Sequence, residues 1–307
     1  MSVELWTLET LVEAYKQHQR RTRGLREQTL HGYERFVRLF VCAALGDDPI
    51  DPRQLGPADV VGFMAAMRGR FSPRSMKAVR TALRSFFRFL RVEGLCDERL
   101  EAALPRVAHW RLSTLPRCLS DEQLALVLAS LDASRSCGRR DRAIVVCLAS
   151  LGLRPGELAD LRLEDIDWRA GTILLRERKT RRGAVLPLPR EAGRAVVAYL
   201  REERPATKER RVFVQQLGVA RGRPLTGNAV SGVVVRALRR GGVEAPLAGA
   251  YVLRHTVASR LVRRGASLKE VADLLGHRAL DTTTIYAKLD LAALREVALP
   301  WPEEVTR

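Results

Sequence analysis

The sequence predicts a mainly α-helical protein of two domains, the second of which also contains a small β-hairpin. The length of 307 residues is that of one large or two ordinary domains. Apolar residues recur at helical spacing through the first part of the chain. In the second part, two β-rich runs, Thr172–Arg176 and Ala184–Leu188, flank a basic loop within sequence that is otherwise helical.

Four helices are expected in the first domain, which we place at residues 1–104. Apolar positions mark them around residues 8–15, 33–41, 57–67 and 72–94. The fourth is the best defined, because Ser72 is a favourable N-cap, Pro73 suits the first turn and Gly94 suits the end of a helix.

Residues 105–119 are expected to link the two domains. Pro105 and Pro116 bracket this stretch, and no helical or strand periodicity runs through it. The second domain then covers residues 120–307 and begins with a helix at Ser120. Its tail, residues 290–307, starts with apolar residues at helical spacing.

The charge of the chain indicates a polyanionic partner. Lys and Arg number 53 against 35 Asp and Glu, a formal net charge of +18. The sequence contains no apolar run of about 18 residues and no signal peptide, so nucleic acid is a better explanation than a membrane surface. A cytoplasmic location follows as the expectation.

Cysteine and histidine give no sign of a disulfide framework or a metal site. The five cysteines are odd in number, and none forms a C-x-x-C pair, which favours reduced thiols. The five histidines are scattered without zinc-ligand spacing. We therefore expect neither a metal nor another cofactor.

A cluster of reactive side chains lies near the C-terminal end. Arg254 follows Tyr251 by three residues, and Tyr286 follows His277 by nine. A guanidinium, an imidazole and a phenol are the anion clamp, proton-handling group and nucleophile that phosphoryl transfer through a covalent intermediate requires. Taken alone, His277 also suits an ordinary polar position after a helix, and Tyr286 a core position.

Further upstream, the run Leu151-Gly-Leu-Arg154-Pro-Gly-Glu157-Leu contributes a second guanidinium with a carboxylate three residues away. Lys179 lies in the basic loop between the two β-rich runs. An ammonium group gives up a proton far more readily than a guanidinium does, so Lys179 is a candidate general acid. Each of these residues alone is also compatible with an exposed charge or, for Glu157, with stabilisation of a helix N-terminus.

In this order, the elements resemble the tyrosine recombinase (phage integrase) family, strongly over residues 118–290 and more weakly over the N-terminal helices. The resemblance implies a SAM-like core-binding domain followed by an α+β catalytic domain of the integrase type. It also implies a set of catalytic residues, supported by Glu157: Arg154, Lys179, Tyr251, Arg254, His277 and Tyr286.

The function implied is site-specific recombination of double-stranded DNA through a 3′-phosphotyrosyl intermediate and a Holliday junction. The enzyme would integrate, excise or resolve DNA without metal or ATP. A homotetramer would assemble on synapsed core sites built from inverted repeats, with the tail packed either on its own domain or on a neighbouring protomer. The two-domain size favours a Xer-like or mobile-element-encoded member.

One residue departs from the family pattern: Tyr251 stands where the family has histidine in His-x-x-Arg. A phenol can donate a hydrogen bond to phosphate but is a poorer base than imidazole near neutral pH. His255, next to Arg254, is expected to point to another side of the helix. This departure makes a catalytically impaired DNA-binding regulator of the same fold one alternative. The other is a type IB topoisomerase-like DNA relaxer, which would use the same chemistry without exchanging partners.

Overall fold

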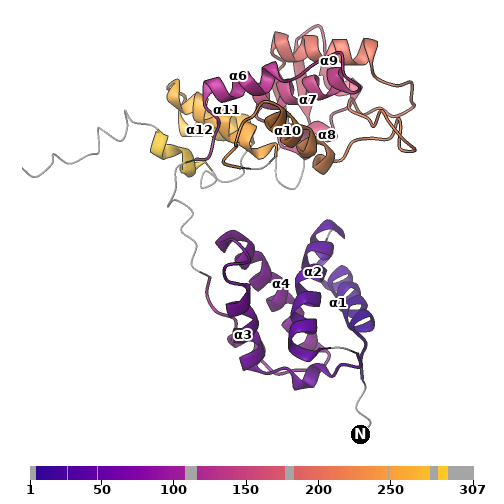
Figure 1. The fold of residues 1–307 in the computed structure, drawn as a ribbon, viewed down its shortest axis with the longest axis vertical. Helices are drawn as coiled ribbons and strands as arrows, with labels where there is room; N and C mark the ends of the chain where they lie inside the picture. The colour runs from indigo at the N-terminus through magenta and orange to yellow at the C-terminus, as the bar shows by residue number, and fades with distance from the viewer. Residues whose placement is uncertain are drawn as a thin grey trace, which may run out of the picture. The chain divides into compact units, whose positions relative to one another are not determined.

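The computed structural model describes residues 5–25, 27–46, 48–107, 116–176, 183–247, 249–276 and 283–289. The chain divides into two compact units, Met1–Trp110 and Arg111–Arg307 (Figure 1). We call these the N-terminal unit and the C-terminal unit. The described residues contain no helix that is long and apolar enough to cross a membrane.

The N-terminal unit is helical, as predicted (Figure 1). Its elements are α1 (Leu8–Arg23), α2 (Glu27–Leu45), the 3-10 turn η1 (Pro52–Gln54), α3 (Pro57–Met67), α4 (Pro73–Val92) and the short α5 (Arg99–Ala102). The expected N-cap of α4 is confirmed, because the Ser72 hydroxyl accepts a hydrogen bond from the Ser75 N–H at 3.2 Å. Gly94 follows the helix with φ +70°, a conformation that glycine adopts without strain.

Aromatic side chains fill the interior of this unit. Phe40 of α2 makes edge-to-face contacts with Phe63 of α3 and Phe87 of α4, both with ring centroids 5.3 Å apart. Tyr15 of α1 contacts Phe86 of α4 in the same way at 5.5 Å. Because one set of rings joins all four long helices, the core is continuous through the unit.

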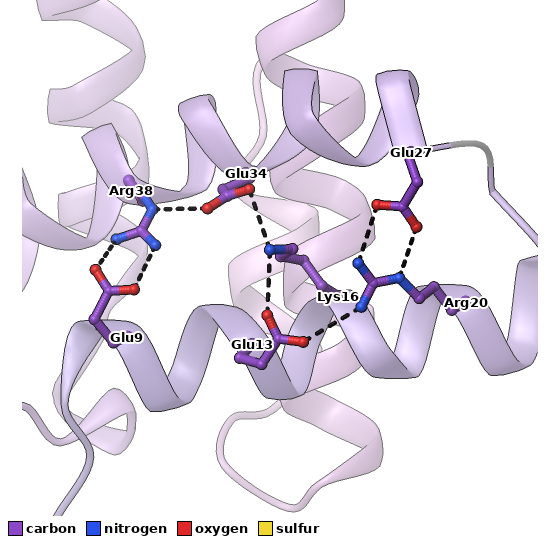
Figure 2. Close-up of polar contacts among 7 residues, drawn as sticks. All are labelled: Glu9, Glu13, Lys16, Arg20, Glu27, Glu34 and Arg38. Carbon is purple, nitrogen blue, oxygen red and sulfur yellow. Dashed lines mark hydrogen bonds and ion pairs between the residues drawn. The ribbon is translucent and has the colours of Figure 1, made fainter.

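Ion pairs join the solvent faces of α1 and α2, as Figure 2 shows. Arg38 donates to both carboxylate oxygens of Glu9, at 2.6 and 2.7 Å. Arg20 binds Glu27 with the same two-bond geometry, at 2.8 and 3.0 Å. Between these pairs, Lys16 lies 3.2 Å from Glu13 and 3.5 Å from Glu34. We call these seven residues the α1–α2 ion-pair ladder.

The ladder should make the stability of the protein fall in acid. Hydrogen bonds from Arg38, Lys16 and Arg20 lower the pKa values of Glu9, Glu13 and Glu27 respectively. A carboxylate whose folded pKa lies below its unfolded pKa contributes stability above the unfolded value, and this contribution is lost as the pH falls through the folded pKa. We expect Arg38→Gln to reduce the difference in unfolding free energy between neutral pH and about pH 3.

Urea unfolding of the full chain followed by circular dichroism measures this difference. Arg21→Gln, on α1, is the matched control and should keep the pH dependence of the unmodified protein. The interpretation is contradicted if the two variants lose equal stability between the two pH values.

The C-terminal unit is helical around a small sheet. Its elements are α6 (Asp121–Ala129), α7 (Gly138–Leu151), α8 (Pro155–Ala159), η2 (Leu163–Asp165), β1 (Ile166–Asp167), β2 (Thr172–Leu175), β3 (Ala184–Pro187), α9 (Arg190–Glu202), α10 (Gly227–Arg240), α11 (Tyr251–Arg263), α12 (Leu268–Leu275) and η4 (Thr284–Leu289). The predicted hairpin is confirmed, with β2 and β3 antiparallel and Thr172 opposite Pro187. The two-residue strand β1, which the sequence did not predict, extends the sheet in the order β1-β2-β3.

Helix α7 is the centre of this unit. Its side chains are buried around most of its circumference, and it packs against α9, α10 and α11. Leu148 and Leu151 belong to the main apolar core, and Gly152 follows them with φ +62°. This left-handed residue ends α7 and turns the chain directly into α8.

Candidate active site

Arg154 is held at the start of α8 by Glu157. The Arg154 N–H donates to one Glu157 carboxylate oxygen at 2.8 Å, and its Nη1 donates to the other at 2.8 Å. The carboxylate therefore caps the helix and also fixes the guanidinium of the residue that precedes it. Glu157 therefore makes both contacts considered for it, one with the helix N-terminus and one with the Arg154 side chain.

Arg254 comes from the first turn of α11 and points into the protein. Its Nη1 donates to the Gly152 carbonyl and its Nη2 to the Leu275 carbonyl, each at 2.7 Å. Its Nη1 also lies 4.0 Å from Glu157 Oε2, so the carboxylate that binds Arg154 lies between the two guanidinium groups. Arg154 and Arg254, which come from distant segments of the sequence, thus bring two permanent positive charges to one carboxylate.

Tyr286 lies in η4 and is 2% exposed. Its ring packs with Ala258 and Val262 of α11 and with Val271 and Leu275 of α12. Burial raises the pKa of the Tyr286 phenol far above its ordinary value, while the positive charge of Arg254 acts in the opposite direction. The buried phenol therefore keeps its proton at neutral pH unless another group accepts it.

The Tyr286 hydroxyl contacts a residue that we expected elsewhere. His255 Nδ1 lies 2.7 Å from Tyr286 Oη, across 31 residues of sequence. The expectation that His255 points away from the site was wrong, because η4 folds back along α11 and covers the side of the helix on which His255 lies. Tyr251 and His255 are one helical turn apart, which was the available hint that His255 belongs to a functional face.

Tyr251 itself is 51% exposed at the first position of α11. We find no hydrogen bond from its phenol to any residue in the described part of the chain. Arg254, by contrast, is 5% exposed and points inward. Tyr251 and Arg254 are three residues apart on α11, but their side chains do not reach the same partners among the described residues.

Several predicted features lie outside the described residues. These are Lys179, His277, residues 108–115 of the expected linker and the tail 290–307. Their assignment stays a prediction from the sequence. Among the described residues, no group of three or more histidine, cysteine, aspartate or glutamate side chains is placed to hold a metal ion. All five cysteines lie in the described part of the chain and are free thiols.

Comparison with known proteins identifies the class. Residues 117–292 match the phage integrase family, and residues 12–94 match the N-terminal SAM-like domain of phage integrases. The chain therefore belongs to the phage integrase family.

Two relatives illustrate the match. A putative integrase/recombinase of Sinorhizobium fredii, y4rA, is 42% identical over 97% of this chain and 72% of its own length. The tyrosine recombinase XerD of Listeria monocytogenes is 32% identical over 90% of this chain and 92% of its own.

Solved structures share the fold. The XerH recombinase in a post-cleavage complex with palindromic difH DNA matches with a TM-score of 0.71 and 22% identity, over 94% of this chain and 83% of that one. A lambda integrase tetramer bound to a Holliday junction matches with a TM-score of 0.70 and 20% identity, over 93% and 78%. At this identity the comparison establishes a common fold, which agrees with the mainly helical architecture predicted from the sequence.

Proposed function

We propose that this protein is a site-specific DNA recombinase that cuts and rejoins duplex DNA through a 3′-phosphotyrosyl link on Tyr286. The observation that carries the proposal is the convergence on Arg254. This buried guanidinium lies beside the Glu157–Arg154 pair, and its Nη2 binds the carbonyl of Leu275, whose side chain belongs to the same apolar cluster as Tyr286. Arg254 thereby connects the guanidinium of Arg154, through Glu157, with the segment that packs near the Tyr286 phenol.

The chemistry follows from these residue types. Attack by Tyr286 Oη on a phosphodiester builds negative charge on the non-bridging oxygens, which two guanidinium groups can bind. The new Oη–P bond forms as the bond from phosphorus to the 5′ oxygen breaks. Lys179 is proposed to give that oxygen its proton. Reversal with the 5′ hydroxyl of another strand rejoins the DNA, so the bond energy is retained in the intermediate.

The proposed substrate is a duplex core site with inverted repeats, synapsed with a second site by a homotetramer. Three facts support this assembly. The chain carries a net charge of +18, XerH was solved on a palindromic substrate, and lambda integrase was solved as a tetramer on a Holliday junction. Integration, excision and resolution all use the same exchange of strands.

Covalent trapping on DNA tests the proposal. A binding site is first selected from a randomised inverted-repeat library, and the selected site is then prepared as a nicked duplex. We expect an SDS-stable protein–DNA adduct, and we expect two such sites on one plasmid to recombine. Binding without an adduct would favour the regulator, whereas an adduct with relaxation of supercoiled DNA but no exchange between sites would favour the topoisomerase-like enzyme.

A further inference from the structure

The hydrogen bond between His255 and Tyr286 connects the proposed nucleophile to a side chain that has no assigned role. His255 Nδ1 is 2.7 Å from Tyr286 Oη, and the two ring centroids are 5.7 Å apart. The histidine is half-buried on α11, and the tyrosine is held against it by η4. The contact is therefore part of the packing of this unit and not a meeting of two exposed side chains.

Attack by a tyrosine requires its proton to leave. The group that takes this proton must lie within about 2.6–3.2 Å of the hydroxyl oxygen and must be able to hold a proton near neutral pH. Imidazole is the side chain whose ordinary pKa suits this transfer. His255 Nδ1 satisfies the distance, and it can accept the proton when the imidazole is neutral with its own proton on Nε2.

Other described groups near the site are less suitable. Tyr251 is 51% exposed and carries a phenol, which gives no driving force for taking a proton from another phenol. Glu157 already accepts hydrogen bonds from the N–H and the guanidinium of Arg154. The Arg254 guanidinium cannot accept a proton, and its positive charge acts to lower the pKa of the Tyr286 phenol.

We propose that His255 accepts the proton of Tyr286 during attack on DNA and is thus a catalytic residue of this enzyme. The inference rests on the proposed function. In this step the proton moves from Oη to Nδ1, the Oη–P bond forms, and the bond from phosphorus to the 5′ oxygen breaks. Lys179 supplies the leaving oxygen with its proton, and His255 returns its own proton to Tyr286 when the strand is rejoined.

A pH dependence follows from this role. A protonated imidazole has no free lone pair at Nδ1, so adduct formation should slow as the pH falls through the range in which imidazole ordinarily takes up a proton. Among the described residues, the charged and titratable groups that affect the pKa of the Tyr286 phenol are Arg254 on the same helix and Cys118, which precedes α6. Arg254 stays charged throughout the range in which imidazole titrates.

The test measures initial rates of SDS-stable adduct formation on the selected nicked duplex across neutral pH. His255→Gln retains hydrogen-bonding atoms but cannot accept the proton, so its rate should fall by about a hundredfold or more. The rate of adduct formation by this variant should also no longer increase with pH. Tyr251→Phe should lose much less and keep the rise with pH. His18→Gln, in the N-terminal unit, is the matched control for the same chemical change.

Two further measurements separate proton transfer from packing. Added imidazole should restore adduct formation to His255→Ala, because a small base can take the place of the missing ring. A DNA substrate with a 5′-bridging sulfur has a leaving group that needs no proton, so it should rescue Lys179→Arg and leave His255→Gln slow.

The inference is overturned if His255→Gln reacts at the rate of the unmodified protein with the same pH dependence. It is also overturned if His255→Gln reacts faster, which would make the contact a restraint on the tyrosine, or if the sulfur substrate rescues it. Failure of the proposed function is a separate outcome, because the unmodified protein would then form no adduct, or Tyr286→Phe would still form one.

Discussion

Tyr286→Phe is expected to abolish the covalent adduct while the protein still folds and binds DNA. Phenylalanine keeps the ring that packs between α11 and α12, so the apolar contacts of the site remain. The oxygen that forms the bond to phosphorus is absent, and loss of a nucleophile lowers turnover by about 10⁴-fold or more. Loss of the hydrogen bond to His255 should cost about 1 kcal/mol of stability.

Adduct formation on the nicked duplex and fluorescence anisotropy with the same DNA measure the two properties. Tyr199→Phe is a matched control, because Tyr199 is also fully buried and its hydroxyl accepts a hydrogen bond from the Val214 N–H at 3.3 Å. This control should lose about the same stability but keep adduct formation. An undiminished adduct in Tyr286→Phe would show that another residue is the nucleophile.

Arg254→Ala is expected to damage both the fold and the reaction. The side chain donates to the carbonyls of Gly152 and Leu275 from a position that is almost fully buried. Its removal leaves both acceptors without this donor and deprives Glu157 of a neighbouring positive charge, so we expect a loss of about 3 kcal/mol or more. Adduct formation should fall further than stability alone explains, because one guanidinium of the proposed phosphate clamp is missing.

Urea unfolding of the full chain measures the stability of this variant. Arg254→Lys separates charge from shape, because an ammonium keeps the charge but lacks the planar fork that reaches two carbonyls. Arg260→Ala, on the same helix, removes a more exposed ion pair with Asp121 and should cost at most about 1 kcal/mol. Equal losses in Arg254→Ala and Arg260→Ala would show that Arg254 does not anchor these segments.

Local patterns explain what could be predicted from the sequence. Ser72, Gly94 and the apolar positions between them specify α4 through short-range rules, and alternation around the basic loop specifies the β2–β3 hairpin. Arg154 and Glu157 are three residues apart, so their contact also follows from helix geometry. The motif order was sufficient to recognise the family.

The features of the structure that the sequence did not predict depend on tertiary packing. The two residues of β1 pair with β2 although they are too few to show a periodicity of their own. The His255–Tyr286 contact arises because η4 returns to α11, and spacing along the chain does not encode that return. Tyr251 is exposed because it opens its helix, whereas Arg254, less than a turn later, points inward.

Arg254 both stabilises the fold and belongs to the proposed phosphate clamp, and this affects how sequences of such proteins should be compared. A descendant that had ceased to cut DNA would still need this arginine, because α11 and the segments around Gly152 and Leu275 are held together through it. Its retention therefore gives little information about activity. The single oxygen of Tyr286 is different, since the fold could lose it at the cost of about one hydrogen bond. Phenylalanine at this position is the substitution that would mark a lineage in which cleavage is no longer under selection.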